Sequence, residues 1–346
     1  MRRRNKCIYA VLLVSLISGL LYGDLIEYGI HQGIGQFHIL YDAVPVSELL
    51  DDPDYPEDQK VKLRLIQEIR EFAIDSLGLN DSESYKKLYD QKGEPALWVL
   101  TAAKPFQLEQ YEWYFPFLGG LGYKGFFVKE KALREEEELI ALDFDTDLGA
   151  VNAWSTLGFF NDPILSNMLE KSPGGLARLI IHELTHGTLY VKGEDAFNEN
   201  LATFVGDNGA IVFMKHKFGE NSFELERYVG ALNDIEKYSD HMTRGTALLY
   251  ELYTGFKDSS YPEEKKRALK NALIRSILQS SDTISFHGRD SYSYLLDPDY
   301  MPNNTYFMSF KRYRGKQNMF QEEFDSSFAG DFSEYLTYLK ESFASH

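Results

Sequence analysis

Cysteine is almost absent from the 346-residue sequence, in which Cys7 is the only one. A single cysteine forms no intrachain disulfide and builds no cysteine metal cluster, so any metal ion must be held by histidine, aspartate or glutamate. Basic residues are also scarce, because 36 lysines and arginines stand against 53 aspartates and glutamates and give a net charge of −17. This charge repels phosphate groups and argues against a nucleic-acid partner.

Internal repeats and low-complexity tracts are lacking as well, so a solenoid is not indicated. Tyrosine and phenylalanine are abundant, with 23 and 24 residues, which is typical of a globular interior rather than of a disordered chain. The length suits one large domain or two closely packed ones.

The N-terminus has the form of an export signal, in which three arginines precede an apolar run over residues 8–22. Cleavage of a signal after Gly23 requires small residues at set positions before the cut, and the sequence does not supply them. We therefore expect residues 1–26 to be an uncleaved membrane anchor. A cleaved signal, which would give a secreted protein, and a buried helix are the alternatives. The arginines should stay in the cytoplasm, which places the body, residues 27–346, on the periplasmic or extracellular side of a bacterial envelope.

The rest of the pattern predicts an α+β fold that is predominantly helical. Apolar residues recur at helical spacing over residues 57–77, and strand-like composition surrounds a turn or hairpin at "FLGGLG". Beyond Ser172 the pattern is almost entirely helical. We expect three parts: a small mixed sheet at about residues 90–160, active-site helices at residues 173–218, and a helical C-terminal part at residues 220–346.

The first active-site helix should contain the segment "HELTH", residues 182–186. Ser172 is a good N-cap and Pro173 a good first helical residue. A basic last turn and a stop are predicted at Lys192 and Gly193. The helix is apolar on most sides, so we expect it to be buried, and buried histidines and a glutamate need partners.

His182 and His186 are the candidate ligands of one zinc ion. Residues four apart share a helix face, with about 5–6 Å between their Cβ atoms, so the two imidazoles can converge. Glu183 can reach a water at the metal without filling a coordination position, which is the placement of a general base. The alternative is a pair of hydrogen-bonded core histidines.

A catalytic zinc has three protein ligands and one open position, so a third ligand is needed from the following segment, "AFNENLATFVGDNGA". Glu199 is the best candidate. A stripe of small residues lies in line with it and should let a second helix approach the first closely: Ala202, Gly206 and Gly209. Asp207 could orient a ligating histidine, and an ordinary helix cap or surface acid is the alternative. Two more candidate acids, Glu194 and Asp195, directly precede this segment.

These residues carry a family resemblance. "HELTH" followed by "NENLAT" resembles the glutamate-zinc metallopeptidases, in which two histidines and a glutamate from a following helix bind zinc. A narrower match is to the putative aminopeptidase family of exported bacterial proteins. It rests on six segments in one order from residue 31 to 313: "HQGIGQ", "YFPFLGGLGYKGFF", "VNAWSTLGFFNDPILSNML", "LIIHELTHGTLY", "FNENLATFVGD" and "MPNNTYFMSFKRY". The resemblance implies a zincin-like metallopeptidase fold.

In this resemblance "VNAWST" takes the place of the edge strand on which peptide substrates lie extended, with Asn152 and Ala153 as substrate-binding residues. An interior strand and turn is the alternative. The usual Gly-Ala-Met-Glu-Asn motif for a free α-amine is absent, so hydrolase activity is better supported than exopeptidase activity. Only 12 residues separate His186 from Glu199, fewer than in the well-known zinc aminopeptidases, so the connection between the helices must be tighter.

Tyr313 is the candidate donor that stabilises negative charge on a tetrahedral oxygen, and a core or surface role is the alternative. We therefore predict a membrane-tethered peptidase, in the family's terms an aminopeptidase, that uses one zinc ion and hydrolyses peptides outside the cytoplasm. A zinc endopeptidase or cell-wall peptide amidase is a second possibility. The third is a noncatalytic envelope protein whose zinc is structural.

Overall fold

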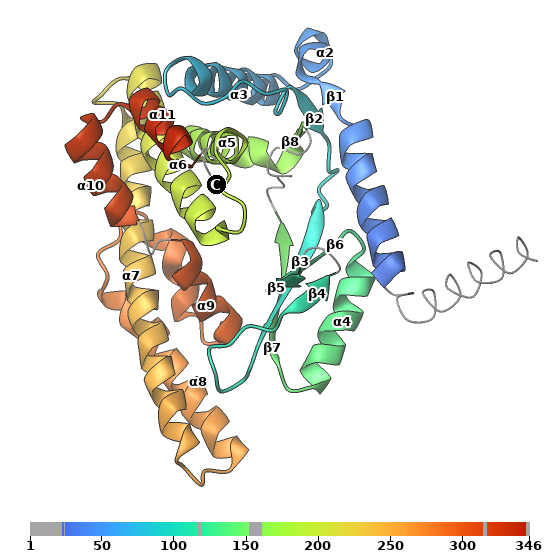
Figure 1. Cartoon of the computed structure of the whole chain (residues 1–346), viewed down its shortest axis with the longest axis vertical. Helices are drawn as coiled ribbons and strands as arrows, with labels where there is room; N and C mark the ends of the chain where they lie inside the picture. Colours follow the sequence, from blue (N-terminus) through green and yellow to red (C-terminus); the bar gives the residue numbers. More distant parts are fainter. Residues whose placement is uncertain (1–22, 24, 116–118, 152–160, 314–316, 344–346) are drawn as a thin grey trace, which may run out of the picture.

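The computed structural model describes residues 23, 25–115, 119–151, 161–313 and 317–343 (Figure 1). The α+β, predominantly helical prediction is confirmed. Residues 25–41 form an N-terminal helix. The later helices are α2 (Val46–Asp51), α3 (Glu57–Asp75), α4 (Lys129–Ala141), α5 (Pro173–Thr188), α6 (Asp195–Phe218), α7 (Phe223–Lys257), α8 (Glu263–Ser280), α9 (Asn304–Tyr313), α10 (Gln317–Phe328) and α11 (Phe332–Phe343).

Short 3-10 helices add η1 (Ser166–Glu170), η2 (Ser281–Thr283) and η3 (Arg289–Leu296). The strands are β1 (Val44–Pro45), β2 (Lys87–Tyr89), β3 (Leu97–Ala103), β4 (Trp113–Phe115), β5 (Gly119–Leu121), β6 (Lys124–Phe126), β7 (Asp145–Val151) and β8 (Ile164–Leu165).

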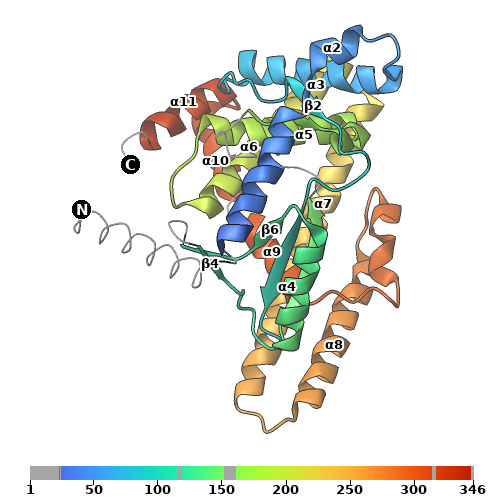
Figure 2. The ribbon, with the colours of Figure 1, turned by 90° about the vertical axis from the view of Figure 1, so that its right-hand side faces the viewer.

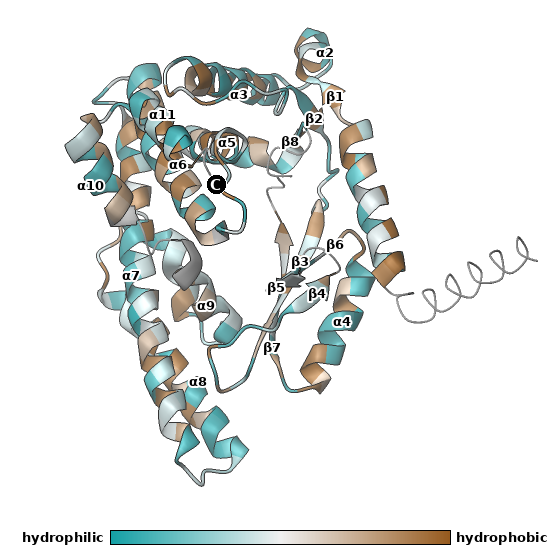
Figure 3. Ribbon diagram, in the orientation of Figure 1, coloured by the Kyte–Doolittle hydropathy of each residue, from teal (hydrophilic) through white to brown (hydrophobic). Residues whose placement is uncertain are grey.

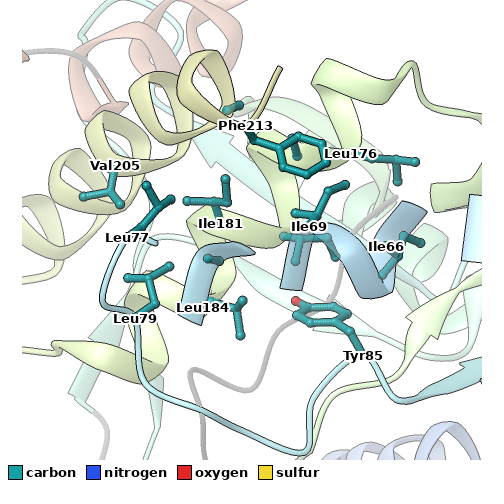
Figure 4. Packing of buried hydrophobic residues seen from close by; sticks show 14 of the residues in the cluster. Ile66, Ile69, Leu77, Leu79, Tyr85, Leu176, Ile181, Leu184, Val205 and Phe213 are labelled. Carbon is teal, nitrogen blue, oxygen red and sulfur yellow. The ribbon is translucent and has the colours of Figure 1, made fainter. Parts of the chain in front are cut away.

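The helix α5 lies in the main hydrophobic core between α3 and α6. Leu176, Ile181 and Leu184 of α5 are almost fully buried. Figure 4 shows them among side chains of α3, α6 and the segment that follows α3. This confirms the expected burial of the helix that carries "HELTH". An apolar helix must be covered by other elements on several sides, so packing fixes the position of this helix.

The strands form three small sheets instead of one. In the largest, β3 pairs antiparallel with β6 and β7, with Leu97 opposite Val151 at one end and Ala103 opposite Asp145 at the other. The hairpin expected at "FLGGLG" is present as β4 and β5. A third sheet, β1-β2-β8, is mixed and lies outside the predicted region at residues 90–160. Its strands have only two or three residues, which is too short for an alternating pattern to reveal.

The end of α5 differs from the prediction. The helix stops at Thr188, and Leu189 is extended with φ −144°. The side-chain amide of Asn198 forms two hydrogen bonds of 2.8 Å with the backbone of Val191, accepting one from its N–H group and donating one to its oxygen. These bonds fix the turn between the helices. Gly193, with φ +82°, serves this turn rather than the helix end. A hydrogen bond from beyond the turn therefore ends the helix earlier than the local stop signal indicates.

A second core joins α7, α8, η3 and α9, and Figure 1 shows α8 running beside the lower half of α7. Among the residues that the structure describes, no helix is long and apolar enough to cross a membrane. Most of the predicted anchor, residues 1–26, lies outside the described residues.

Candidate metal centre

The close contact between α5 and α6 brings the candidate ligands together. Ser172 caps α5, because its Oγ accepts a hydrogen bond of 3.2 Å from the amide of Gly175. A Cβ atom at Gly206 would lie 2.9 Å from the backbone oxygen of Arg178 and 3.1 Å from Cβ of His182. At Gly209 it would lie 3.1 Å from a side-chain atom of Ile181 on α5. The prediction that small residues on α6 allow close approach is therefore confirmed.

His182, His186 and Glu199 converge at this contact, with their ligand atoms within 4.8 Å of one another. The Nε2 atoms of the two histidines lie 3.2 Å apart. Oε2 of Glu199 is 3.7 Å from Nε2 of His182, and Oε1 is 3.6 Å from Nε2 of His186. Zn–N distances of 2.0–2.1 Å at tetrahedral angles separate neighbouring donor atoms by roughly 3.3 Å. The three side chains therefore fit a tetrahedral ion.

Burial keeps both imidazoles neutral, which is the form that binds a metal. It lowers the pKa of His182 to about 3, with further lowering by His186 and by the charge of Arg178. Burial likewise lowers the pKa of His186 to about 4. Nδ1 of His186 is buried and has no hydrogen-bond partner among the described residues. Because both rings are neutral, their Nε2 atoms can act as ligands, and the group could bind a metal ion.

The comparisons with known proteins agree with this geometry at the level of the family. A family model described as "putative aminopeptidase" matches residues 27–344 of the chain. The chain belongs to this family. No match was found among curated proteins or among solved structures. Membership supports a peptidase at a coarse level.

In this member of the putative aminopeptidase family, Glu183 is half-buried and lines a polar cavity of about 220 Å³ together with Leu184 and Gly187 of α5. Tyr85, Asp81 and Asp162 also line the cavity. Burial raises the pKa of Tyr85 well above its usual value, and the carboxylates of Glu183 and Asp162 raise it further. The Tyr85 phenol is therefore a neutral hydrogen-bond donor beside Glu183.

Tyr85 and Asp162 are residues that the sequence reasoning missed. Tyr85 has a positive φ of 63°, and its backbone amide donates a hydrogen bond of 2.7 Å to the backbone oxygen of Asp162. Strained backbone of this kind often marks functional sites. The pairing joins segments that are far apart in the sequence, so no local pattern could have indicated it.

Asp207 lies on α6, where its carboxylate forms an ion pair with Arg178 of α5. Its backbone oxygen accepts a hydrogen bond of 3.2 Å from the hydroxyl of Tyr228. Because Arg178 lowers the pKa of His182, Asp207 can act on that histidine by holding the guanidinium in place. A role for Asp207 around the ligands stays a prediction.

Three predicted site residues are not placed by the structure. Asn152 and Ala153 lie outside the described residues, and the strand β7 that leads to them ends at Val151. Tyr313 is the last residue of α9, and its side chain lies outside the described part of the chain. Of the other candidate ligands, Glu194 is exposed at the start of α6, away from the group that converges.

Proposed function

We propose that the protein is a zinc-dependent peptidase that acts outside the cytoplasm as an aminopeptidase. The observation that carries the proposal is the convergence of His182, His186 and Glu199 at tetrahedral donor spacing. The set of two imidazoles and one carboxylate is the donor set of several catalytic zinc sites. Among the described residues, the convergent group holds three ligands and no fourth, which supports a catalytic rather than a structural zinc.

His182 and His186 would hold the ion from one face of α5, and Glu199 would hold it from α6. When bound, zinc supplies Lewis acidity, which makes water a stronger acid and a peptide carbonyl a better electrophile. Glu183 would take a proton from the attacking water and pass it to the leaving amine. Its place beside the ligands, at the edge of a polar cavity, supports this role.

The cavity beside Glu183 supports an aminopeptidase over an endopeptidase. Asp162 lines this space of about 220 Å³ together with Glu183, and the carboxylate of Asp81, another lining residue, forms an ion pair with Arg70. A free α-amine is positively charged at neutral pH, and such a space would attract it. The cavity would thus take the place of the amine-binding motif that the sequence lacks. An amine-blocked peptide would lose this attraction.

Location outside the cytoplasm and membrane attachment rest on the N-terminal sequence. The basic cluster and the apolar run at residues 8–22 support export with retention at the membrane. The proposed substrate is therefore a peptide in the periplasm or outside the cell.

The decisive experiment compares metal content with turnover in three variants. Glu183→Gln should keep one zinc ion per chain and lose turnover of a peptide library by at least about 100-fold, because general-base catalysis contributes this much. Retained turnover would remove Glu183 from the mechanism. Glu199→Ala should release zinc during dialysis, while the control Glu194→Ala should retain it. Equal retention by both would point to another third ligand.

Peptides with free and blocked N-termini then separate the candidate activities. Preference for free amines supports the aminopeptidase, and Asp162→Asn should weaken that preference. Equal cleavage of blocked peptides would favour an endopeptidase or a cell-wall peptide amidase. Stoichiometric zinc with no turnover of any peptide would favour a noncatalytic envelope protein.

A further inference from the structure

The N-terminal helix, residues 25–41, has one face that is fixed to the body of the protein. The ring of Tyr28 lies 5.6 Å from that of Phe115, and Nε2 of Gln32 donates a hydrogen bond of 2.7 Å to the oxygen of Gly125. Gly35 lies directly against the ring of Phe127, and Ile39 is only 2 % exposed. Figure 2 shows this helix on the side of the molecule that faces the viewer. The helix is thus held in one orientation.

The opposite face carries large apolar side chains that are 49–75 % exposed. We call them the apolar stripe: Ile26, Ile30, Ile34, Phe37 and Tyr41. Their spacings of three and four residues keep them within an arc of about 80° on a helix that turns 100° per residue. The repeated brown bands on this helix in Figure 3 follow from apolar residues on both of its faces. A stripe about 22 Å long, at 1.5 Å per residue, therefore faces outward.

The sequence just before the helix indicates what covers the apolar stripe. The apolar run at residues 8–22 ends four residues before Ile26. If this run enters a bilayer, the helix starts at the membrane surface. A helix there with one apolar face lies in the boundary between headgroups and acyl chains.

The size of the apolar stripe favours lipid over a second copy of the chain. At 150–250 Å² for a large side chain and about half of it exposed, five side chains present on the order of 500 Å². Each partner in a stable protein complex buries about 800 Å². Anionic lipids would not draw in a protein with a net charge of −17, so the attraction must be apolar.

We propose that the N-terminal helix is a membrane-contact element that lies in the bilayer surface with the apolar stripe turned toward the acyl chains. This contact is additional to the proposed N-terminal anchor, on which the placement at the bilayer surface rests. Because the other face is fixed to the body, it sets the orientation of the whole protein on the membrane. The inference does not depend on zinc or on peptidase activity.

Lipid photocrosslinking in the full chain tests this placement. The protein is reconstituted in phosphatidylcholine vesicles that contain a phospholipid with a photoreactive acyl chain, and adducts are located by mass spectrometry. We expect adducts in residues 25–41 as well as in residues 8–22. The triple variant Ile30→Ser, Ile34→Ser, Phe37→Ser should lower the yield in residues 25–41 by about tenfold or more, because it removes most of the apolar contact.

A matched control replaces three exposed apolar residues of α7 and should leave the adducts in residues 25–41 unchanged: Phe223→Ser, Leu248→Ser and Tyr250→Ser. Both triple variants should keep the thermal unfolding midpoint of the parent, because they alter exposed side chains. Adducts confined to residues 8–22 would overturn the proposal. A dimer in detergent that the stripe variant abolishes, without lipid adducts in residues 25–41, would also overturn it and assign the stripe to a second copy.

Discussion

Replacing Gly206 with alanine should damage the candidate metal centre without altering any of its three candidate ligands. The new Cβ would lie 2.9 Å from the backbone oxygen of Arg178 and 3.1 Å from Cβ of His182, where ordinary contacts begin at 3.4 Å. A backbone oxygen inside a helix cannot turn away as a flexible side chain can. The helix α6 must therefore move away from α5 by about 0.3–0.5 Å.

Two opposing terms set the change in the free energy of unfolding. Alanine favours a helix over glycine by about 1 kcal/mol, whereas overpacking of a close contact costs about 1–3 kcal/mol. We expect a net loss of stability of about 0–2 kcal/mol. Glu199 lies seven residues earlier on the same helix, so the shift also reaches its carboxylate. Metal sites tolerate about 0.2 Å in their distances, so zinc affinity should fall about tenfold or more.

The assay is zinc titration against a chelating dye, combined with unfolding in urea. Gly255→Ala is the matched control, because Gly255 also lies in a helix and a Cβ atom there would meet nothing within 4 Å. The control should gain up to about 1 kcal/mol and keep its zinc affinity. If Gly206→Ala behaves like this control in both measurements, the close contact does not position the ligands.

Two further predictions concern the body of the protein and the ion. Lys270 is 4 % exposed and forms an ion pair with Asp145 at the start of β7. Lys270→Met should lower the free energy of unfolding by about 3 kcal/mol in urea, because the buried carboxylate loses its charged partner while it keeps the hydrogen bond from the amide of Asn304. An unchanged urea midpoint would show that this pair is solvated. Removal of zinc by a chelator should lower the thermal midpoint of the parent and leave that of His186→Ala nearly unchanged, since only the parent gains stability from a bound ion. Equal shifts in both would place the ion elsewhere.

The local parts of the fold and of the site could be predicted from the sequence. The start of α5 follows from Ser172 and Pro173, and the convergence of His182 and His186 follows from helical geometry alone. The approach of Glu199 required one tertiary assumption, that small residues mark a close helix contact, and Gly206 bears this out.

The remaining parts depend on contacts between distant segments. Asn198 ends α5 five residues before the predicted stop, by hydrogen bonds to the turn that precedes α6. Tyr85 reaches the cavity of Glu183 because its backbone pairs with Asp162. Neither contact leaves a periodic pattern, and an isolated tyrosine among many carries no signal of its own. Propensity and spacing therefore describe the helix that carries the ligands but not the cavity beside it.

The same packing that buries α5 also prepares its histidines for a metal. Burial lowers the pKa of both imidazoles, so they stay neutral at physiological pH and need no proton release to bind an ion. A buried ring nitrogen without a partner is costly in the core, and Nδ1 of His186 is such an atom among the described residues. The Nε2 atoms of both rings instead face the carboxylate of Glu199 from α6. A core selected for stability alone would fill that contact with apolar side chains, so the buried histidine pair favours a function such as binding a metal ion.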